Sequence, residues 1–337
     1  MHTKKHNLSK KILTWYDNNK RILPWRLCAN TKKVQYYRIL SEFMLQQTQV
    51  KTVVPYFKNF IKEVPNLTAL SNKKGRRVLK LWEGLGYYRR ARNLHKTAKI
   101  LIKKYNGKLP KKLEEIKTLP GVGEYTARAL LALVYNQSYI PFDGNVRRVF
   151  SRLFNLNIEK NEKKIKKIIS KQFYTDRNGD LAEALMEFGA IICKPHDPVC
   201  NICNLKANCY FFKNQISVST HKKHKEKEEK YNIYCYLKKQ KKEIALTKNK
   251  NLSFLSNFKI PKTTIATSKN NKKRGGWIYL CNYKNNISNI KMDINLFYKF
   301  TKNKPENFTW YSIEKSSNEF IPSFTKSIIK KVAKVYL

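Results

Sequence analysis

Residues 119–127 read Leu-Pro-Gly-Val-Gly-Glu-Tyr-Thr-Ala, and they separate two segments that have the apolar spacing of helices. Two glycines, Gly121 and Gly123, allow the backbone to turn sharply and leave amide N–H groups exposed where the next helix starts. Such amides suit a phosphate group and read no base sequence. A Gly-x-Gly pair also occurs in ordinary turns, so the surrounding sequence has to decide between these interpretations.

The region around this hairpin has a helical pattern from about residue 8 to residue 212. Apolar residues recur at spacings of three and four, as in Ile39, Leu40, Phe43 and Met44. Turn signals such as Asn106-Gly107 divide the pattern into short helices. The sequence therefore predicts a mainly α region over residues 1–212.

The C-terminal third has a different character. Residues 213–230 are polar and dense in charge, which predicts a linker because they bury little apolar surface. Residues 231–237 and 277–283 alternate and are rich in aromatics, so we expect strands there. Residues 322–335 have helical spacing. We expect a small α+β domain over residues 231–337.

The composition indicates a polyanionic partner. The chain has 337 residues, with 70 Lys and Arg against 23 Asp and Glu, a formal net charge of +47. A charge of this size favours binding to nucleic acid. No apolar run reaches the length of a membrane span, and residues 1–11 lack the apolar core of a signal peptide. We expect a soluble cytoplasmic protein without a membrane partner.

Four of the seven cysteines fall within 17 residues, with the spacing Cys193-x6-Cys200-x2-Cys203-x5-Cys209. In a reducing compartment such a group indicates a metal site rather than disulfides. Four thiolates can hold either zinc or an iron–sulfur cluster. All-cysteine zinc sites usually use two Cys-x-x-Cys pairs, and only one pair is present here, which favours [4Fe–4S].

Two acidic residues stand in distinctive strings. Glu42 lies in Ser-Glu-Phe-Met-Leu-Gln-Gln-Thr-Gln-Val (41–50), where apolar neighbours favour its protonated form. Asp143 lies in Pro-Phe-Asp-Gly-Asn-Val-Arg-Arg (141–148), just before a helical pattern. Their ordinary roles would be a solvated helix residue and a helix N-cap. Two carboxyls in different environments are also what glycosidic bond cleavage requires.

Taken in order, these motifs resemble the MutY type of adenine glycosylase, within the helix-hairpin-helix family that includes endonuclease III. Residues 21–26 (Arg-Ile-Leu-Pro-Trp-Arg) and 81–92 also match that family. The resemblance implies a six-helix module at about 30–138 and a second module from residues 1–29 and 139–212. It implies one structural [4Fe–4S] cluster per chain on the four cysteines, and a Nudix-like lesion-recognition domain at 231–337.

The resemblance also implies catalytic roles. Glu42 would protonate adenine as a general acid, and Asp143 would stabilise or transiently bond the sugar cation. Asn145 would position Asp143 or the attacking water. Glycosylases that are also lyases carry a Lys two residues after the second hairpin glycine, whereas this chain has Tyr125. A monofunctional glycosylase is therefore expected.

Further family positions would bind the extruded base or the duplex, because chemistry on a base requires flipping it out of the stack. The adenine pocket would use Arg21, Trp25, Leu45 and Glu187. DNA contacts would come from the wedge Gln47, from Tyr87 or Tyr88, from the hairpin glycines Gly121 and Gly123, and from the basic residues Lys194 and Lys206 of the cysteine loop.

The expected substrate is adenine paired with 8-oxoguanine or guanine in double-stranded DNA, bound by a monomer in a bacterial nucleoid. The family's lesion-reading loop aligns best with Ile287-Ser288-Asn289, so Ser288 and Asn289 would read 8-oxoguanine. Two alternatives stay open at this point: an endonuclease III-type glycosylase-lyase, and a non-catalytic, cluster-bearing DNA-binding protein.

Overall fold

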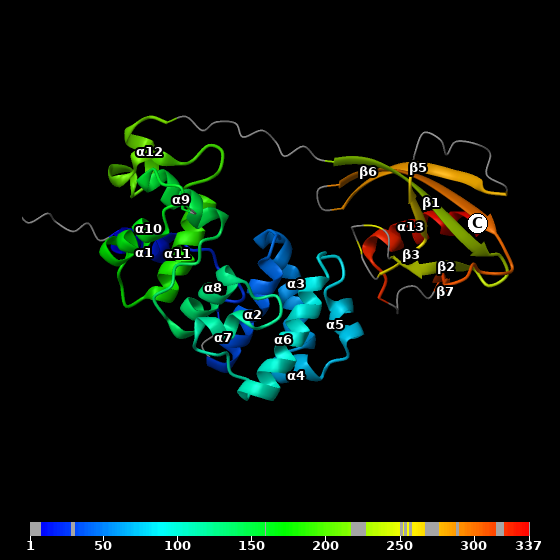
Figure 1. Ribbon diagram of the computed structural model, residues 1–337, viewed down its shortest axis with the longest axis horizontal. Coiled ribbons are helices and arrows are strands. Elements are labelled where there is room, and N and C mark those ends of the chain that lie inside the picture. The colour runs from blue at the N-terminus through cyan, green and yellow to red at the C-terminus, as the bar shows by residue number, and fades with distance from the viewer. Residues whose placement is uncertain are drawn as a thin grey trace, which may run out of the picture. The chain divides into compact units, whose positions relative to one another are not determined.

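The computed structural model describes residues 8–27, 31–158, 160–216, 227–249, 252, 255, 258–266, 276–287, 290–314 and 320–336. The chain forms two compact units, Met1–Thr220 and His221–Leu337 (Figure 1). Among the described residues, no helix has both the length and the apolar character needed to cross a membrane.

The first unit is helical, which confirms the mainly α prediction for this region. Ile39, Leu40, Phe43 and Met44 are all fully buried, as their spacing predicts. The helices are α1 (Leu8–Asn19), α2 (Thr31–Leu45), α3 (Val50–Glu63), α4 (Leu67–Asn72), α5 (Gly75–Leu81), α6 (Arg89–Tyr105), α7 (Leu113–Lys117), α8 (Glu124–Tyr135), α9 (Gly144–Phe154), α10 (Glu162–Gln172), α11 (Asn178–Ile191), η1 (Cys200–Ile202), η2 (Lys206–Asn208) and α12 (Tyr210–Lys213).

Segments from the two ends of this unit share one core. Leu8 and Ile12 of α1 pack with Val146 of α9 and Leu185 of α11, and the cluster extends to Leu205 in the cysteine loop. Helices α2 to α8 lie between residues 31 and 135, where they form seven helical segments rather than the six expected. Three of the seven, α4, α5 and α7, have only five to seven residues.

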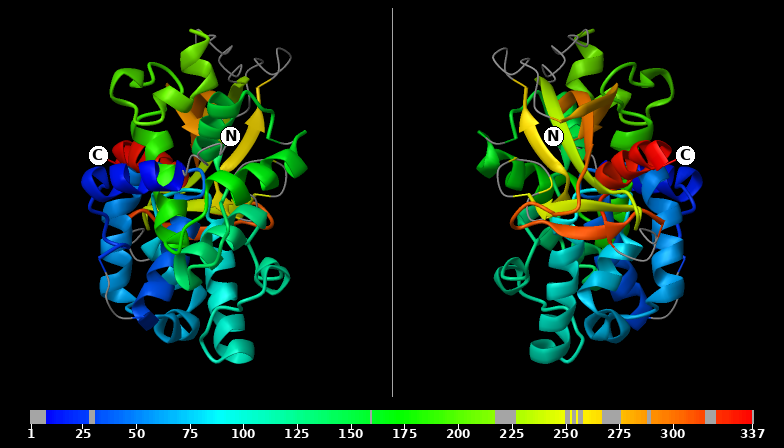
Figure 2. Two further views of the ribbon diagram at one scale, coloured as in Figure 1. Left: turned by 90° about the vertical axis from the view of Figure 1, so that its left-hand side faces the viewer. Right: turned by 90° about the vertical axis from the view of Figure 1, so that its right-hand side faces the viewer.

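The second unit is α+β, as expected. Its strands are β1 (Lys227–Lys238), β2 (Glu243–Lys248), β3 (Lys259–Ile260), β4 (Lys262–Ile265), β5 (Ile278–Ile287), β6 (Ile290–Phe300) and β7 (Thr309–Ser312). The strand order is β3-β2-β1-β6-β5, with β4 paired to β1 and β7 paired to β2. Helix α13 (Ser323–Ala333), followed by η5 (Lys334–Tyr336), covers one face of the sheet (Figures 1 and 2).

The expected linker over residues 213–230 is wrong at both ends. Lys213 closes α12, and residues 227–230 already belong to β1. The first residues of β1 pair in parallel with β6, beginning with Lys227 opposite Ile290. Their strand conformation therefore depends on backbone hydrogen bonds to a distant segment, and their mainly exposed charged side chains give no apolar pattern.

Candidate active site

The first candidate residue, Glu42, lies near the C-terminal end of α2. The helix turns this position towards the core, and Glu42 is only 6% exposed. Burial raises the pKa of its carboxyl to about 7, and the charges of Glu183 and Asp143 add to the rise. The charge of Arg38 and a hydrogen bond with Tyr125 act in the opposite direction. Glu42 is therefore a carboxyl with a substantial protonated fraction near neutral pH.

Asp143 is the N-cap of α9. One carboxylate oxygen accepts a hydrogen bond from the Val146 backbone N–H at 2.7 Å, and the other accepts one from Asn145 Nδ2 at 3.0 Å. Burial raises the pKa of Asp143, while these hydrogen bonds and the charge of Arg148 oppose the rise. Capping confirms the ordinary role foreseen for this residue, and it holds both oxygens in a defined orientation.

Tyr125 lies in the first turn of α8, beside both carboxyls. Its hydroxyl lies 3.3 Å from Met186 Sδ and hydrogen-bonds with the Glu42 carboxyl. Burial raises the pKa of Tyr125 well above its ordinary value, and the charges of Glu42 and Asp143 raise it further. Three residues from α2, α8 and the start of α9 thus share one electrostatic environment.

Arg148 ties Asn145 to the neighbouring segments. Its Nη2 donates to Asn145 Oδ1 at 2.8 Å and to Gly189 O at 2.7 Å, and its Nε donates to Cys193 O at 2.7 Å. A Cβ atom built on Gly189 would stand 2.6 Å from Asn145 Cβ, so this close approach requires glycine. In the sequence, Arg148 is only one basic residue of the string 141–148, and nothing there marks its role.

A second group of carboxyls lies on α11. Glu183, which no sequence motif marks, accepts hydrogen bonds from Tyr16 Oη at 2.7 Å, from Arg26 Nε at 3.0 Å and from Arg38 Nη1. Burial raises the pKa of Glu183, but the charges of Arg38 and Arg26 outweigh it, so that the pKa is lowered overall. In the sequence, the one sign of this buried site is that Glu183 is an acidic residue at an apolar position of the helical pattern.

The expected adenine-pocket residues lie partly together. Arg21 forms a bidentate ion pair with Glu187, at 2.6 Å from Nε and 2.8 Å from Nη2. Trp25 is buried, with its ring edge-to-face with Phe57. Leu45 is half-buried at the end of α2. Arg21 and Glu187 hydrogen-bond to each other here.

Two expected DNA contacts are exposed and have left-handed backbone conformations. Gln47 has φ +56° and Tyr87 has φ +48°. Arg90 lies between their segments: its Nη1 donates to Met44 O at 2.7 Å, and its guanidinium lies 5.4 Å from the centre of the Tyr87 ring. Of the two tyrosines expected near DNA, Tyr88 is only 5% exposed and packs inside the loop that precedes α6, whereas Tyr87 lies at the surface.

The hairpin lies against the end of α2. Gly121 has φ +81°, and a Cβ there would meet Phe43 Cε1 at 2.9 Å, so only glycine fits. The Gly121 carbonyl accepts a hydrogen bond from Gln46 Nε2 at 3.1 Å. Gly123 is the N-cap of α8 and provides no side chain to bond the first amides of the helix.

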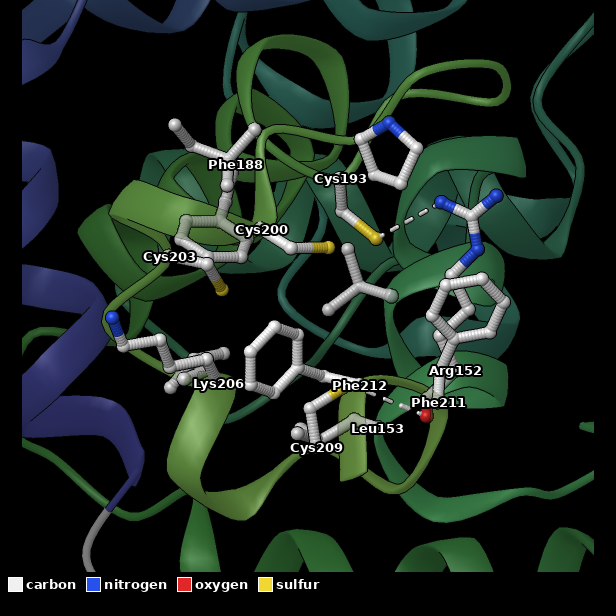
Figure 3. A pocket seen from close by; sticks show the side chains of 14 residues that line it. Arg152, Leu153, Phe188, Cys193, Cys200, Cys203, Lys206, Cys209, Phe211 and Phe212 are labelled. Carbon is white, nitrogen blue, oxygen red and sulfur yellow. Dashed lines mark hydrogen bonds between the residues drawn. The ribbon is translucent and has the colours of Figure 1, made fainter. Parts of the chain in front are cut away.

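The four clustered cysteines line one cavity in the first unit. Cys193 follows α11, Cys200 begins η1, Cys203 follows η1 and Cys209 precedes α12 (Figure 3). Apolar side chains form much of the wall, and Arg152 Nη1 donates to Cys193 Sγ at 3.5 Å. Burial raises the pKa of the Cys203 thiol to about 11, and the other three thiols add to the rise.

The donor set of this cavity fits an iron–sulfur cluster, which takes four thiolate ligands. A cubane has four irons and takes one thiolate on each, so its ligands stand farther apart than the ligands of one ion. Four thiols line this apolar cavity, one for each iron.

The remaining predicted residues make few contacts or lie outside the described residues. Lys194 and Lys206 are both exposed on the cysteine loop, and Lys206 Nζ donates to Asn201 O at 3.1 Å. Ser288 and Asn289 fall between β5 and β6, outside the described residues. Cys28 is outside them as well.

Comparison with known proteins shows which class of proteins shares the fold of the helical unit. The HhH-GPD superfamily of base excision DNA repair proteins matches residues 40–174. A thermostable thymine-DNA glycosylase of known structure is 26% identical, with a TM-score of 0.54 over 61% of this chain and 95% of its own. The helical unit therefore has the fold of a base excision DNA glycosylase.

Two relatives identify the family within that class. An adenine DNA glycosylase of Buchnera aphidicola subsp. Baizongia pistaciae is 37% identical over 96% of both chains. One from Buchnera aphidicola subsp. Schizaphis graminum is 34% identical over 96% of this chain and 97% of its own. The chain belongs to the adenine DNA glycosylase family, and it is an enzyme of base excision repair.

Proposed function

We propose that this enzyme hydrolyses adenine from A:8-oxoG and A:G mispairs in double-stranded DNA, with Glu42 as the general acid. The observation that carries the proposal is the buried Glu42 carboxyl, whose pKa is raised to about 7, in the same environment as Asp143. A general acid works best when its pKa lies near the working pH. The base leaves as a neutral molecule once Glu42 has donated its proton to a ring nitrogen.

Asp143 supplies the negative charge for the sugar. Departure of adenine leaves an oxocarbenium-like cation, which a carboxylate of fixed orientation stabilises or bonds transiently. The Val146 N–H and Asn145 Nδ2 hold the two Asp143 oxygens in that orientation. Asn145 therefore positions the carboxylate, and water completes the hydrolysis.

We further propose that the enzyme is monofunctional. Tyr125 occupies the position where a lyase would carry its amine, and a phenol forms no Schiff base with the opened sugar. Tyr125 instead acts through its hydrogen bond to Glu42. Breakage of the DNA strand at the abasic site is not expected from this chain.

For the cofactor, we propose one [4Fe–4S] cluster bound by Cys193, Cys200, Cys203 and Cys209. When bound, the cluster serves as a structural cross-link for the loop. The loop presents Lys194 and Lys206 at the surface, where ammonium groups suit DNA phosphates. Arg152 binds this loop at two backbone carbonyls, with 2.6 Å to Lys194 O and 2.8 Å to Pro195 O.

The remaining assignments are proposals from resemblance and charge. Arg21, Trp25, Leu45 and Glu187 would surround the flipped adenine, and binding would require Arg21 or Glu187 to exchange part of their ion pair for the base. Gln47 and Tyr87 would enter the duplex. The second unit would read 8-oxoguanine through Ser288 and Asn289. We expect a monomer bound to the bacterial nucleoid, favoured by the net charge of +47.

The direct test is a glycosylase assay on A:8-oxoG, A:G and A:T duplexes with the full-length enzyme and Glu42→Gln. We expect the variant to lose about 10²–10⁴-fold in single-turnover excision while still binding DNA. The matched control is Glu63→Gln, which removes an exposed carboxyl paired with Arg77. Undiminished excision by Glu42→Gln would overturn the role of Glu42. Trapping of a covalent DNA adduct by borohydride would instead indicate lyase chemistry.

A further inference from the structure

Arg38 lies between two buried carboxyls of opposite character. It precedes Glu42 by four residues in α2, so both side chains lie on the same face of the helix. Its Nη1 donates to Glu183 on α11, across 145 residues of sequence. Its Nε is buried and has no hydrogen-bond partner. The guanidinium is thus held towards Glu183 while one donor remains available.

Glu183 is a buried carboxylate that binds the Arg38 guanidinium. It is 5% exposed, and Tyr16 and Arg26 bind it as well as Arg38. Three donors to one buried carboxylate keep it ionised and fixed in position.

We propose that Glu183 is a positioning residue for excision, which holds the Arg38 guanidinium against α11 and thereby preserves the protonated form of Glu42. The inference rests on the proposed role of Glu42 as the acid. Without Glu183, Arg38 would be an uncompensated cation with free donors, one helical turn from a carboxyl. Such a cation favours the carboxylate form, which cannot donate a proton.

The groups that face Glu42 come from four elements. Arg38 is on α2, Tyr125 on α8, Asp143 at the N-cap of α9 and Glu183 on α11. Arg90, from α6, binds the backbone carbonyls of α2 instead. Of these groups, only Arg38 and Glu183 bind each other, so a change to one alters how the other acts on Glu42.

The sign of the effect follows from these charges. Replacing Glu183 by Gln removes a negative charge that raises the pKa of Glu42, and it frees Arg38, which lowers it. Both changes favour ionised Glu42. Replacing Arg38 by Gln removes the cation and should raise the pKa. A purely structural role would give no such opposite shifts.

The test first measures the titration of the Glu42 carboxyl and then the rate of adenine excision. In full-length protein with ¹³C-labelled glutamate, the Glu42 carboxyl resonance is the one that Glu42→Gln removes. Glu183→Gln should lower its titration midpoint by about one pH unit, with about a tenfold loss of single-turnover excision at about pH 8 and little loss at about pH 6. Arg38→Gln should shift the midpoint upwards, and the double variant should return it towards wild type.

Asp180→Asn is the matched control, because Asp180 lies one turn earlier on α11 and pairs with the exposed Arg177. It should leave both the midpoint and the pH profile unchanged. An unshifted Glu42 midpoint in Glu183→Gln would overturn the inference, and so would an unshifted midpoint in Arg38→Gln. If Glu183→Gln does not fold, the Arg38→Gln shift decides alone. Retained excision by Glu42→Gln would instead overturn the proposed function, whatever the midpoints show.

Discussion

Two pairs of buried carboxyls in the helical unit have opposite surroundings. Glu42 and Asp143 have few cations close to them, and burial raises the pKa of each. Glu183 and Glu187 are also buried, but arginines bind both of them and hold their pKa values below normal. All four are acids on helices or helix caps, so the arrangement of arginines makes the difference.

This contrast separates reactive carboxyls from structural ones. A buried carboxylate that arginines fully bind gains stability from ionisation and releases no proton near neutral pH. A buried carboxyl without that compensation costs stability when it ionises, and it can act as an acid instead. The same fold therefore keeps Glu42 available for proton transfer and uses Glu183 to organise the cations beside it.

The largest expected effect on stability is that of Glu183→Gln. The substitution leaves the buried Arg38 without its carboxylate and leaves Arg26 with Glu187 alone, which should lower the free energy of unfolding by about 3–5 kcal/mol. Urea denaturation at neutral pH measures it. Adding Arg38→Gln should recover part of the loss, since one uncompensated cation disappears. A loss that the second substitution deepens would contradict the pairing.

Glu42→Gln should change the free energy of unfolding in the opposite direction to Glu183→Gln, by raising it. The folded-state pKa of about 7 lies above the ordinary value of 4.5, so wild-type stability falls as pH rises between these values. An amide does not ionise, and the variant should gain up to about 3 kcal/mol at about pH 8 relative to its difference at about pH 4. Denaturation curves across this range measure the gain. A pH-independent difference would show that Glu42 has an ordinary pKa.

The smallest effect is expected for Asp17→Asn. Asp17 pairs with Arg177 at 2.7 Å, but their side chains are 41% and 40% exposed. An exposed pair contributes at most about 1 kcal/mol, and added salt weakens it. A thermal melt at low and high salt checks this. A change as large as that of Glu183→Gln would mean that burial does not distinguish the two groups.

Local sequence predicted the helices of the first unit and several residues of the candidate site. The spacing of Ile39, Leu40, Phe43 and Met44 predicted their burial, and Asp143 was foreseen as a helix cap. In the second unit, β2 and β6 were not foreseen, and residues 227–230 were taken as linker. Those strands owe their formation to pairing between distant segments, which no local pattern contains.

Tyr87 and Tyr88 show that local sequence also does not predict which side chain of the site is exposed. Adjacent residues of one type gave no reason to choose between them. The fold exposes Tyr87 and buries Tyr88, because the backbone has φ +48° at Tyr87 and the next side chain turns into the core. Orientation at such a turn is set by packing.

The hairpin glycines, the four-cysteine spacing and the string around Glu42 are short-range patterns, so the sequence alone determines them. The electrostatic state of the acids was not readable. Arg38 and Glu183 are 145 residues apart, and Arg21 and Glu187 are 166 apart. A pKa depends on burial and on charges within a few ångströms. Only the packing of α11 beside α1 and α8 brings those charges together, and it thereby decides which carboxyls are paired and which one can give up a proton.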